Sequence, residues 1–144
     1  ALAVTTSLEA LVEKGFGARN GAATGPGAAP LSKLAGEVVI HDPCVFARYE
    51  GIVEEPRALL AATGMTVKEP EKTGRMTWCC GGPVEALYPQ KARANAEKRV
   101  GQLTDVSSEV VTMCPMCFIN LSGAAPEGVT FNDISHYLHR AFVA

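Results

Sequence analysis

The hydrophobic and polar positions from residue 37 onward alternate between short apolar runs and longer amphipathic stretches. The short runs are rich in β-branched or aromatic residues and predict buried strands. They are EVVI (37–40), TVKE (66–69), RMTW (75–78), EVVTM (109–113) and VTFN (129–132). TVKE is the weakest of these strand predictions. RMTW is included because it leads directly into the adjacent cysteines at 79 and 80.

The longer stretches carry the 3.6-residue period of helices. Residues 48–63 show this period, with Pro56 marking a turn or a second helix start. A clearer amphipathic helix starts near Pro89, where apolar residues recur at spacings of four, four and three: Ala92, Ala96, Val100 and Leu103. Pro115 is suited to open a further helix, and Asp133 to cap a closing one.

The alternation of strands and helices predicts an α/β domain over residues 37–144, with a mostly parallel sheet flanked by helices. Residues 1–36 are expected to stand apart from this domain. They contain a short predicted helix at 6–14, followed by a linker rich in Gly, Ala and Pro.

Composition narrows the class of protein. The chain has 144 residues, of which 47% are apolar and 19% charged, which suits one domain with a proper hydrophobic core. A net charge of -2 gives no indication of nucleic-acid binding, and the apolar runs are too short to span a bilayer. No signal peptide is recognisable, so we expect a cytoplasmic protein, either free or peripheral to a membrane complex. Because the chain begins with Ala1, we also expect a fragment or a processed product.

All five cysteines fall into one arrangement. They are Cys44, the adjacent pair Cys79 and Cys80, and Cys114 and Cys117 in a C-P-M-C motif. An odd count in a chain of this length disfavours a disulfide framework. Isolated buried cysteines that act as small hydrophobic residues are the alternative. A C-C pair and a C-x-x-C motif within one domain favour a metal or redox centre, because thiolates are preferred ligands of iron–sulfur clusters and soft metals.

The spacing of the cysteines also predicts where such a centre lies. Each group of cysteines follows one of the strand-like runs EVVI, RMTW and EVVTM. The 34 residues between Cys44 and Cys79, and the 33 between Cys80 and Cys114, each match about one ~30-residue crossover unit. Ligands collect at the carboxyl ends of parallel strands, so we expect three cysteine loops to converge on that edge of the sheet.

The residues beside the cysteines suit a metal centre. Gly81 and Gly82 allow the backbone to approach a cluster closely and to adopt dihedrals that other residues avoid. Cys117 is expected in the first turn of the helix that Pro115 opens, where the helix dipole and free N–H groups stabilise a thiolate.

Other residues are weaker candidates. His41 could donate a hydrogen bond to the centre or shuttle a proton, although a histidine that merely ends a strand fits equally well. Arg48 could offset the charge of several thiolates or lie at the surface. His136 and His139 are interpreted as an ordinary helix face. The charged residues after Pro89 are expected on a solvated face, with a docking surface for an acidic electron carrier as the alternative: Lys91, Arg93, Lys98 and Arg99.

The number of cysteines leaves the identity of the metal open. A closed zinc site takes four ligands, commonly from two C-x-x-C pairs, and only one such pair occurs here. A cubane iron–sulfur cluster uses four cysteines and would leave one unused. A cluster of unusual geometry, with a fifth bridging sulfur, would employ all five.

The complete pattern, C-x34-C-C-x33-C-x2-C with HDPC, CCGG and CPMC at its three positions, resembles the CCG cysteine-rich domain. That domain occurs in heterodisulfide reductase and in iron–sulfur subunits of anaerobic glycerol-3-phosphate dehydrogenase, glycolate oxidase and lactate-utilisation systems. The resemblance covers about residues 37–142. It implies a noncubane [4Fe-4S] cluster on Cys44, Cys79, Cys80, Cys114 and Cys117, although some members are thought to hold zinc.

The resemblance also implies a function. The expected activity is that of a heterodisulfide reductase-like iron–sulfur oxidoreductase domain, which exchanges electrons with a ferredoxin-like, flavoprotein or membrane-cytochrome partner. It would either conduct electrons only or also reduce a disulfide substrate. The best-known relatives carry two such domains in tandem and often a longer glycine run than CCGGP, whereas this chain carries one domain. The alternative is a zinc-binding structural or interaction domain without redox activity.

Overall fold

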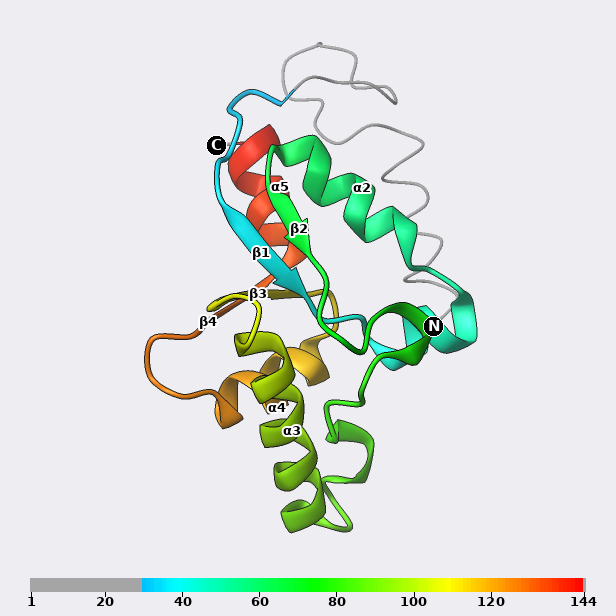
Figure 1. The fold of residues 1–144 in the computed structure, drawn as a ribbon. Helices are drawn as coiled ribbons and strands as arrows, with labels where there is room; N and C mark the ends of the chain where they lie inside the picture. Colours follow the sequence, from blue (N-terminus) through cyan, green and yellow to red (C-terminus); the bar gives the residue numbers. More distant parts are fainter. Residues whose placement is uncertain (1–29, 144) are drawn as a thin grey trace.

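The computed structural model describes residues 30–143, so the helix expected at 6–14 and most of the predicted linker lie outside the described part. The centre is a sheet of four parallel strands in the spatial order β2-β1-β3-β4. The strands are β1 (Glu37–Ile40), β2 (Thr66–Lys68), β3 (Glu109–Thr112) and β4 (Thr130–Asp133). The described helices that flank it are α2 (Glu54–Thr63), α3 (Pro89–Thr104), α4 (Pro115–Ala124) and α5 (Ile134–Phe142). This arrangement confirms the predicted α/β class (Figure 1).

The two central strands are buried on both faces. β1 and β3 pair in parallel, with Val39 opposite Val110 and Ile40 opposite Val111. These four side chains and that of Val38 are fully buried. Strands of parallel sheets that are covered on both faces are continuously apolar, which explains why neither run alternates with polar residues.

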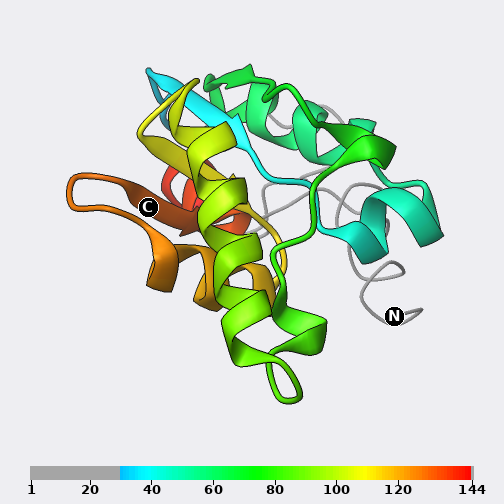
Figure 2. The ribbon, with the colours of Figure 1, turned by 60° about the horizontal axis from the view of Figure 1, so that its bottom comes forward.

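A pair of helices covers each face of the sheet (Figures 1 and 2). On one face, α2 and α5 pack together, and Leu60 of α2 joins Val38 in one apolar core. On the opposite face, α3 and α4 pack together, and Ala96 and Leu121 join Val39 in a second core. The predicted amphipathic stripe of α3 therefore faces the sheet.

The starts of three helices agree with the prediction. α3 begins at Pro89 and α4 at Pro115, where the fixed φ of proline suits the first turn. Asp133 caps α5, because its Oδ1 accepts a hydrogen bond from the backbone N–H of Ser135 at 2.9 Å. None of the helices in residues 30–143 is both long and apolar enough to cross a membrane.

The helical stretch expected over residues 48–63 is divided in two. A π-helical segment, η1 (Val45–Glu50), ends at Gly51, which has a φ of 73°. α2 then begins at Glu54 and accommodates Pro56 in its first turn, where a backbone N–H is not needed for the helix. The interruption itself lies at Gly51, and Pro56 lies in the first turn of the second helix, in agreement with the helix start expected near this proline.

The prediction of a strand at residues 75–78 is wrong. Gly74–Met76 forms a single 3-10 turn, η2, and within residues 30–143 this segment belongs to no sheet. Side chains bind its backbone instead: the N–H of Gly74 donates to Asp42 Oδ2 at 2.7 Å, and Gly74 has a φ of 53°. Met76 points into solvent, so the run lacks the burial that stabilises a short strand.

Replacing Asp133 with Ala should lower the free energy of unfolding by about 1 kcal/mol, because the N–H of Ser135 loses its acceptor. Urea denaturation followed by circular dichroism measures this change. Asp105→Ala, at the exposed end of α3, is the control and should change the free energy of unfolding by less than ~0.5 kcal/mol. Equal losses from both variants would contradict the capping role.

Candidate metal centre

The cysteines meet at the carboxyl edge of the sheet by two different routes. Cys44 follows β1 through the turn His41-Asp42-Pro43, and Cys114 follows β3 after a single residue. The chain between β2 and α3 carries Cys79 and Cys80 along this edge as a loop. Two of the three cysteine groups thus leave strands as predicted, and the third arrives without a strand.

The two glycines of CCGG are required by close packing against two helices. Gly81 has a φ of 87°, and a Cβ at this position would lie 2.5 Å from the backbone oxygen of Ala92 in α3. A Cβ on Gly82 would collide with Met116 of α4. The loop that carries the cysteine pair therefore runs along α3 and meets the start of α4 (Figure 2). The predicted freedom of these glycines is confirmed at Gly81.

Four of the five sulfurs form a series of neighbours, and Cys44 lies close enough for its charge to act on one of them. Cys80 and Cys117 are buried, the other three are partly buried, and all five are free. Hydrogen bonding between neighbouring thiols shifts the pKa values along the series Cys79, Cys80, Cys117 and Cys114, and the charge of Cys44 contributes to the raised pKa of Cys79. Within residues 30–143, no three His, Cys, Asp or Glu side chains are grouped so as to hold a single metal ion. The sulfurs are connected in pairs and do not surround one point.

Hydrogen bonds divide the sulfurs into thiolates and thiols. The thiols of Cys117 and Cys79 donate to Cys80 and hold its pKa far below the ordinary value. The neighbouring Cys117 side chain and the backbone N–H groups of Cys117 and Met116 lower the pKa of Cys114 to about 6, and the single Cys117 proton is shared between its two sulfur neighbours. The pKa values of Cys79 and Cys117 are raised, because these two thiols supply the protons. A lowered pKa favours the deprotonated sulfur, which is the form that binds metals.

Backbone N–H groups add to this stabilisation. The N–H of Gly81 lies 3.4 Å from Cys79 Sγ, and the N–H of Gly82 lies 3.4 Å from Cys80 Sγ. Both donors belong to the turn that the two glycines make. The N–H dipoles of this turn therefore stabilise negative charge on the sulfurs, which are in turn available to bind a metal.

Arg99 overturns one expectation from the sequence. Its charge predicts a place on the solvated face of the helix after Pro89, but it is fully buried on the face of α3 that meets the sheet. Its guanidinium donates to His41 Nδ1 at 3.0 Å, to the backbone oxygen of Lys72 at 2.8 Å and to Gln102 Oε1 at 3.0 Å. Burial lowers its pKa to about 10, where it is still charged at neutral pH.

A signal for this burial is present in the sequence. Ala92, Ala96, Arg99 and Leu103 follow one another at spacings of four, three and four, which places Arg99 on the apolar stripe of α3. The helical period shows which face is buried, but it does not show which charged residue on that face will be tolerated. Arg99 is tolerated there because polar acceptors surround it at the end of the sheet.

Asp42 connects the turn after β1 to two other segments. Its carboxylate accepts bidentate hydrogen bonds from Arg57 of α2 at 2.8 and 2.9 Å, and a further bond from the N–H of Gly74. Arg57 also binds Glu69, at 2.7 and 2.8 Å. Burial opposes ionisation of Asp42, yet the Arg57 hydrogen bonds and charge keep its pKa below the ordinary value. This network fixes the loops that carry the first three cysteines.

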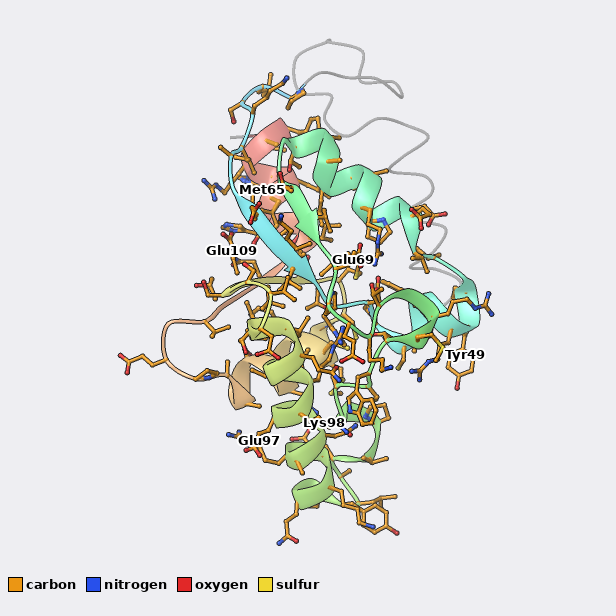
Figure 3. The ribbon with its side chains drawn as sticks, viewed as in Figure 1. Tyr49, Met65, Glu69, Glu97, Lys98 and Glu109 are labelled. Atoms are coloured by element: carbon orange, nitrogen blue, oxygen red, sulfur yellow. The ribbon has the colours of Figure 1, made fainter. Side chains whose placement is uncertain are left out.

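Asn95 of α3 is a further residue of the site, and no motif in the sequence points to it. It donates to the backbone oxygen of Cys79 at 3.3 Å and accepts from Trp78 Nε1 at 2.9 Å. Lys98, one turn further along α3, places its ammonium 4.0 Å from the centre of the Trp78 ring (Figure 3). Together they hold the cysteine pair against α3.

The remaining candidates lie away from the sulfurs or act on the backbone. Arg48 is exposed and donates to the backbone oxygens of Arg75 and Thr77, so it supports the loop and is not the buried charge near the thiols. His136 and His139 are exposed on α5, as expected for an ordinary helix face.

The chemistry of these groups fits an anionic iron–sulfur centre. Arg99 is a buried cation whose hydrogen-bond acceptors within residues 30–143 are all neutral, and the charges of Asp42 and Cys117 stabilise it from a distance. His41 Nε2 is buried and has no hydrogen-bond partner in the described part. Leaving a buried donor without a partner costs about 1–3 kcal/mol, so an acceptor is expected beside it. Cysteine sulfurs, N–H donors and a buried cation together match a cluster with anionic sulfur ligands.

Fold and site together define a class of protein: a parallel α/β domain with a five-thiol site at the carboxyl edge of its sheet. The family model described as CCG, cysteine-rich domain, matches residues 38–122. The chain therefore belongs to the CCG cysteine-rich domain family, as its resemblance indicated. No solved structure matches it with statistical significance.

Several curated proteins are similar to the chain. A probable membrane-anchored ferredoxin of Chromohalobacter salexigens is 36% identical over 74% of this chain and 17% of its own length. One component of the dihydromethanophenazine:CoB–CoM heterodisulfide reductase of Methanosarcina acetivorans is 36% identical over 58% of this chain and 22% of its own length. An EtfAB:quinone oxidoreductase of Syntrophomonas wolfei is 30% identical over 78% of this chain and 18% of its own length. The match thus covers about a fifth of each relative, and the relatives are named as iron–sulfur or oxidoreductase proteins.

Replacing Asp42 with Asn should lower the free energy of unfolding at pH 7 by about 2 kcal/mol, because Arg57 loses its buried bidentate partner and keeps only the exposed Glu69. Urea denaturation tests this. Since the pKa of Asp42 is below 3.8 in the folded protein, its stabilisation is present above that pH and is lost as the pH falls through the lowered pKa. The variant should lack this acid-dependent loss.

The control is Glu97→Gln, which breaks the exposed Arg93–Glu97 pair of α3 and should cost no more than about 0.5 kcal/mol. If Asp42→Asn lowers the free energy of unfolding by no more than the control does, the Asp42 network does not hold the loops.

Proposed function

We propose that this chain is an iron–sulfur domain of an oxidoreductase, in which Cys44, Cys79, Cys80, Cys114 and Cys117 hold a noncubane [4Fe-4S] cluster. The observation that carries the proposal is the convergence of five free cysteines on one edge of the sheet, four of them as a series of neighbours. When bound, an iron–sulfur cluster accepts and releases electrons. The chain's own residues hold the thiolates, supply N–H dipoles and exclude water from Cys80 and Cys117.

The alternative, a zinc-binding structural domain, explains fewer of these features. A single tetrahedral zinc uses four ligands and would leave one of the five thiols without a role. The sulfurs are connected as a row through Cys79, Cys80, Cys117 and Cys114. A row of sulfurs suits several metal ions better than one.

The names of the relatives support a role in electron transfer within a larger assembly. They include a membrane-anchored ferredoxin and a quinone oxidoreductase, and this chain matches only part of each. We therefore propose that the domain exchanges electrons with a ferredoxin-like, flavoprotein or membrane-cytochrome partner, peripheral to a membrane. Reduction of a disulfide is the finer proposal, supported by the heterodisulfide reductase component among the relatives.

Protein purified without oxygen should be brown and contain about four iron atoms per chain. Iron and acid-labile sulfide assays, together with the visible absorption spectrum, measure this. Colourless protein with one zinc per chain, even after anaerobic reconstitution with iron and sulfide, would refute the proposal.

Replacing Cys80 with Ser should remove most of the iron, because Cys80 is the buried sulfur that contacts both Cys79 and Cys117. Met116→Leu is the matched control: it changes a sulfur-containing side chain beside the same loop and should keep the iron content of the wild type. Full iron content in Cys80→Ser would argue for a site with fewer ligands. The circular dichroism spectrum of each variant checks that the fold is retained.

A further inference from the structure

His41 lies on the same face of the sheet as the buried cysteines. It directly follows β1, and its N–H donates to the backbone oxygen of Val111 at 2.8 Å, so it continues the β1–β3 register. Side chains alternate between the faces of a strand, which places His41 with Val39 on the face covered by α3 and α4. The same apolar core contains Cys80 and Cys117. His41 is thus a fully buried ring beside the sulfur site.

Arg99 determines which ring nitrogen of His41 carries the proton. The Nε–H of Arg99 donates to His41 Nδ1 at 3.0 Å. A guanidinium can only donate, so Nδ1 must present its lone pair and the ring proton must sit on Nε2. Arg99 is itself fixed by Lys72 and Gln102, so it cannot easily turn away.

The N–H at His41 Nε2 has no acceptor among residues 30–143, although it is completely buried. On the neighbouring strand, the hydroxyl of Thr112 is also buried and without a partner. Buried polar atoms of native proteins nearly always have a partner. The nearby thiolate is that of Cys80, whose charge acts on His41. An acceptor is therefore expected on this side of the ring, in the same core as Cys80 and Cys117.

We propose that His41 is a positioning residue that donates a permanent Nε2–H hydrogen bond to a sulfur of the iron–sulfur centre, and that Arg99 fixes the required tautomer. This inference rests on the proposed function. It selects between the two roles considered for His41, because a ring fixed in this way donates a hydrogen bond but does not shuttle protons. Hydrogen bonds to cluster sulfurs favour the reduced state, which carries more negative charge.

The charges around His41 agree with a ring that stays neutral. Burial and the Arg99 charge disfavour protonation and lower the pKa of His41 to about 3, while the charges of Cys80 and Asp42 act in the opposite direction. The ring therefore keeps one proton throughout the pH range in which an enzyme works.

Pulsed electron paramagnetic resonance on the cluster-loaded protein, labelled with 15N-histidine and brought to a paramagnetic state, tests the hydrogen bond directly. The expected result is one weak 15N coupling together with one exchangeable proton, both absent in His41→Phe and present in the control His139→Phe. A loaded cluster with no 15N coupling would overturn the inference and leave the proposed function intact. Protein that takes up no iron would refute both. The wild-type measurement decides even if His41→Phe does not fold.

A redox titration separates the fixed donor from a proton shuttle. The midpoint potential should be lower in His41→Phe than in the wild type, and His41→Gln, which keeps an N–H donor, should recover part of the difference. In the wild type the potential should not change between pH 6 and 8. A fall of ~59 mV per pH unit that His41→Phe abolishes would overturn the inference, since it would show that the ring gains a proton on reduction.

Arg99→Met should free the tautomer of His41, so that the 15N coupling and the exchangeable-proton coupling of the cluster weaken. Arg93→Met, on the exposed face of the same helix, is the matched control and should leave both couplings as in the wild type. Couplings in a cluster-loaded Arg99→Met protein that equal those of the wild type would show that Arg99 does not set the state of His41.

Discussion

The arrangement of the cysteines depends on one buried carboxylate, that of Asp42. The loop that carries Cys79 and Cys80 has no strand pairing within residues 30–143 to hold it at the edge of the sheet. Asp42 replaces that pairing, because it binds the N–H of Gly74 in this loop and the guanidinium of Arg57 in α2. A buried carboxylate is stable only with such partners. The network therefore fixes both the loop and α2 relative to β1.

The surroundings of the sulfurs are matched to negative charge. N–H groups of Gly81 and Gly82 point at two sulfurs, and the cation of Arg99 is buried with only neutral acceptors in the described part. A site built in this way stabilises thiolates and any anionic centre that they hold, and it limits the access of water. In these low-dielectric surroundings each hydrogen bond to a sulfur is electrostatically stronger than it would be in water. The packing of α3, which excludes water, is in this way connected to the redox behaviour proposed for the domain.

Most of the fold could be predicted, because continuous β-branched runs and helical periods report burial directly. β1, β3 and β4 lie within about one residue of their predicted positions, and α3 and α4 begin at the expected prolines. The run at residues 75–78 could not be predicted correctly, since its four residues carry a weak preference that Asp42 and Gly74 override through long-range hydrogen bonds. Arg99 could not be placed from its charge, which suggests solvent, whereas its position in the helical period indicates burial.

The sequence by itself determined the class of the fold, the family and the set of thiols, because these depend on residue types and spacing alone. The tertiary structure decided how the sulfurs contact one another and which residues surround them. Only the packing of α3 against the sheet brings Arg99 to His41, residues 58 positions apart, and so determines which nitrogen of the ring holds its proton. Spacing along a chain cannot report that contact, because a hydrogen bond between distant segments exists only once both are buried against the same sheet.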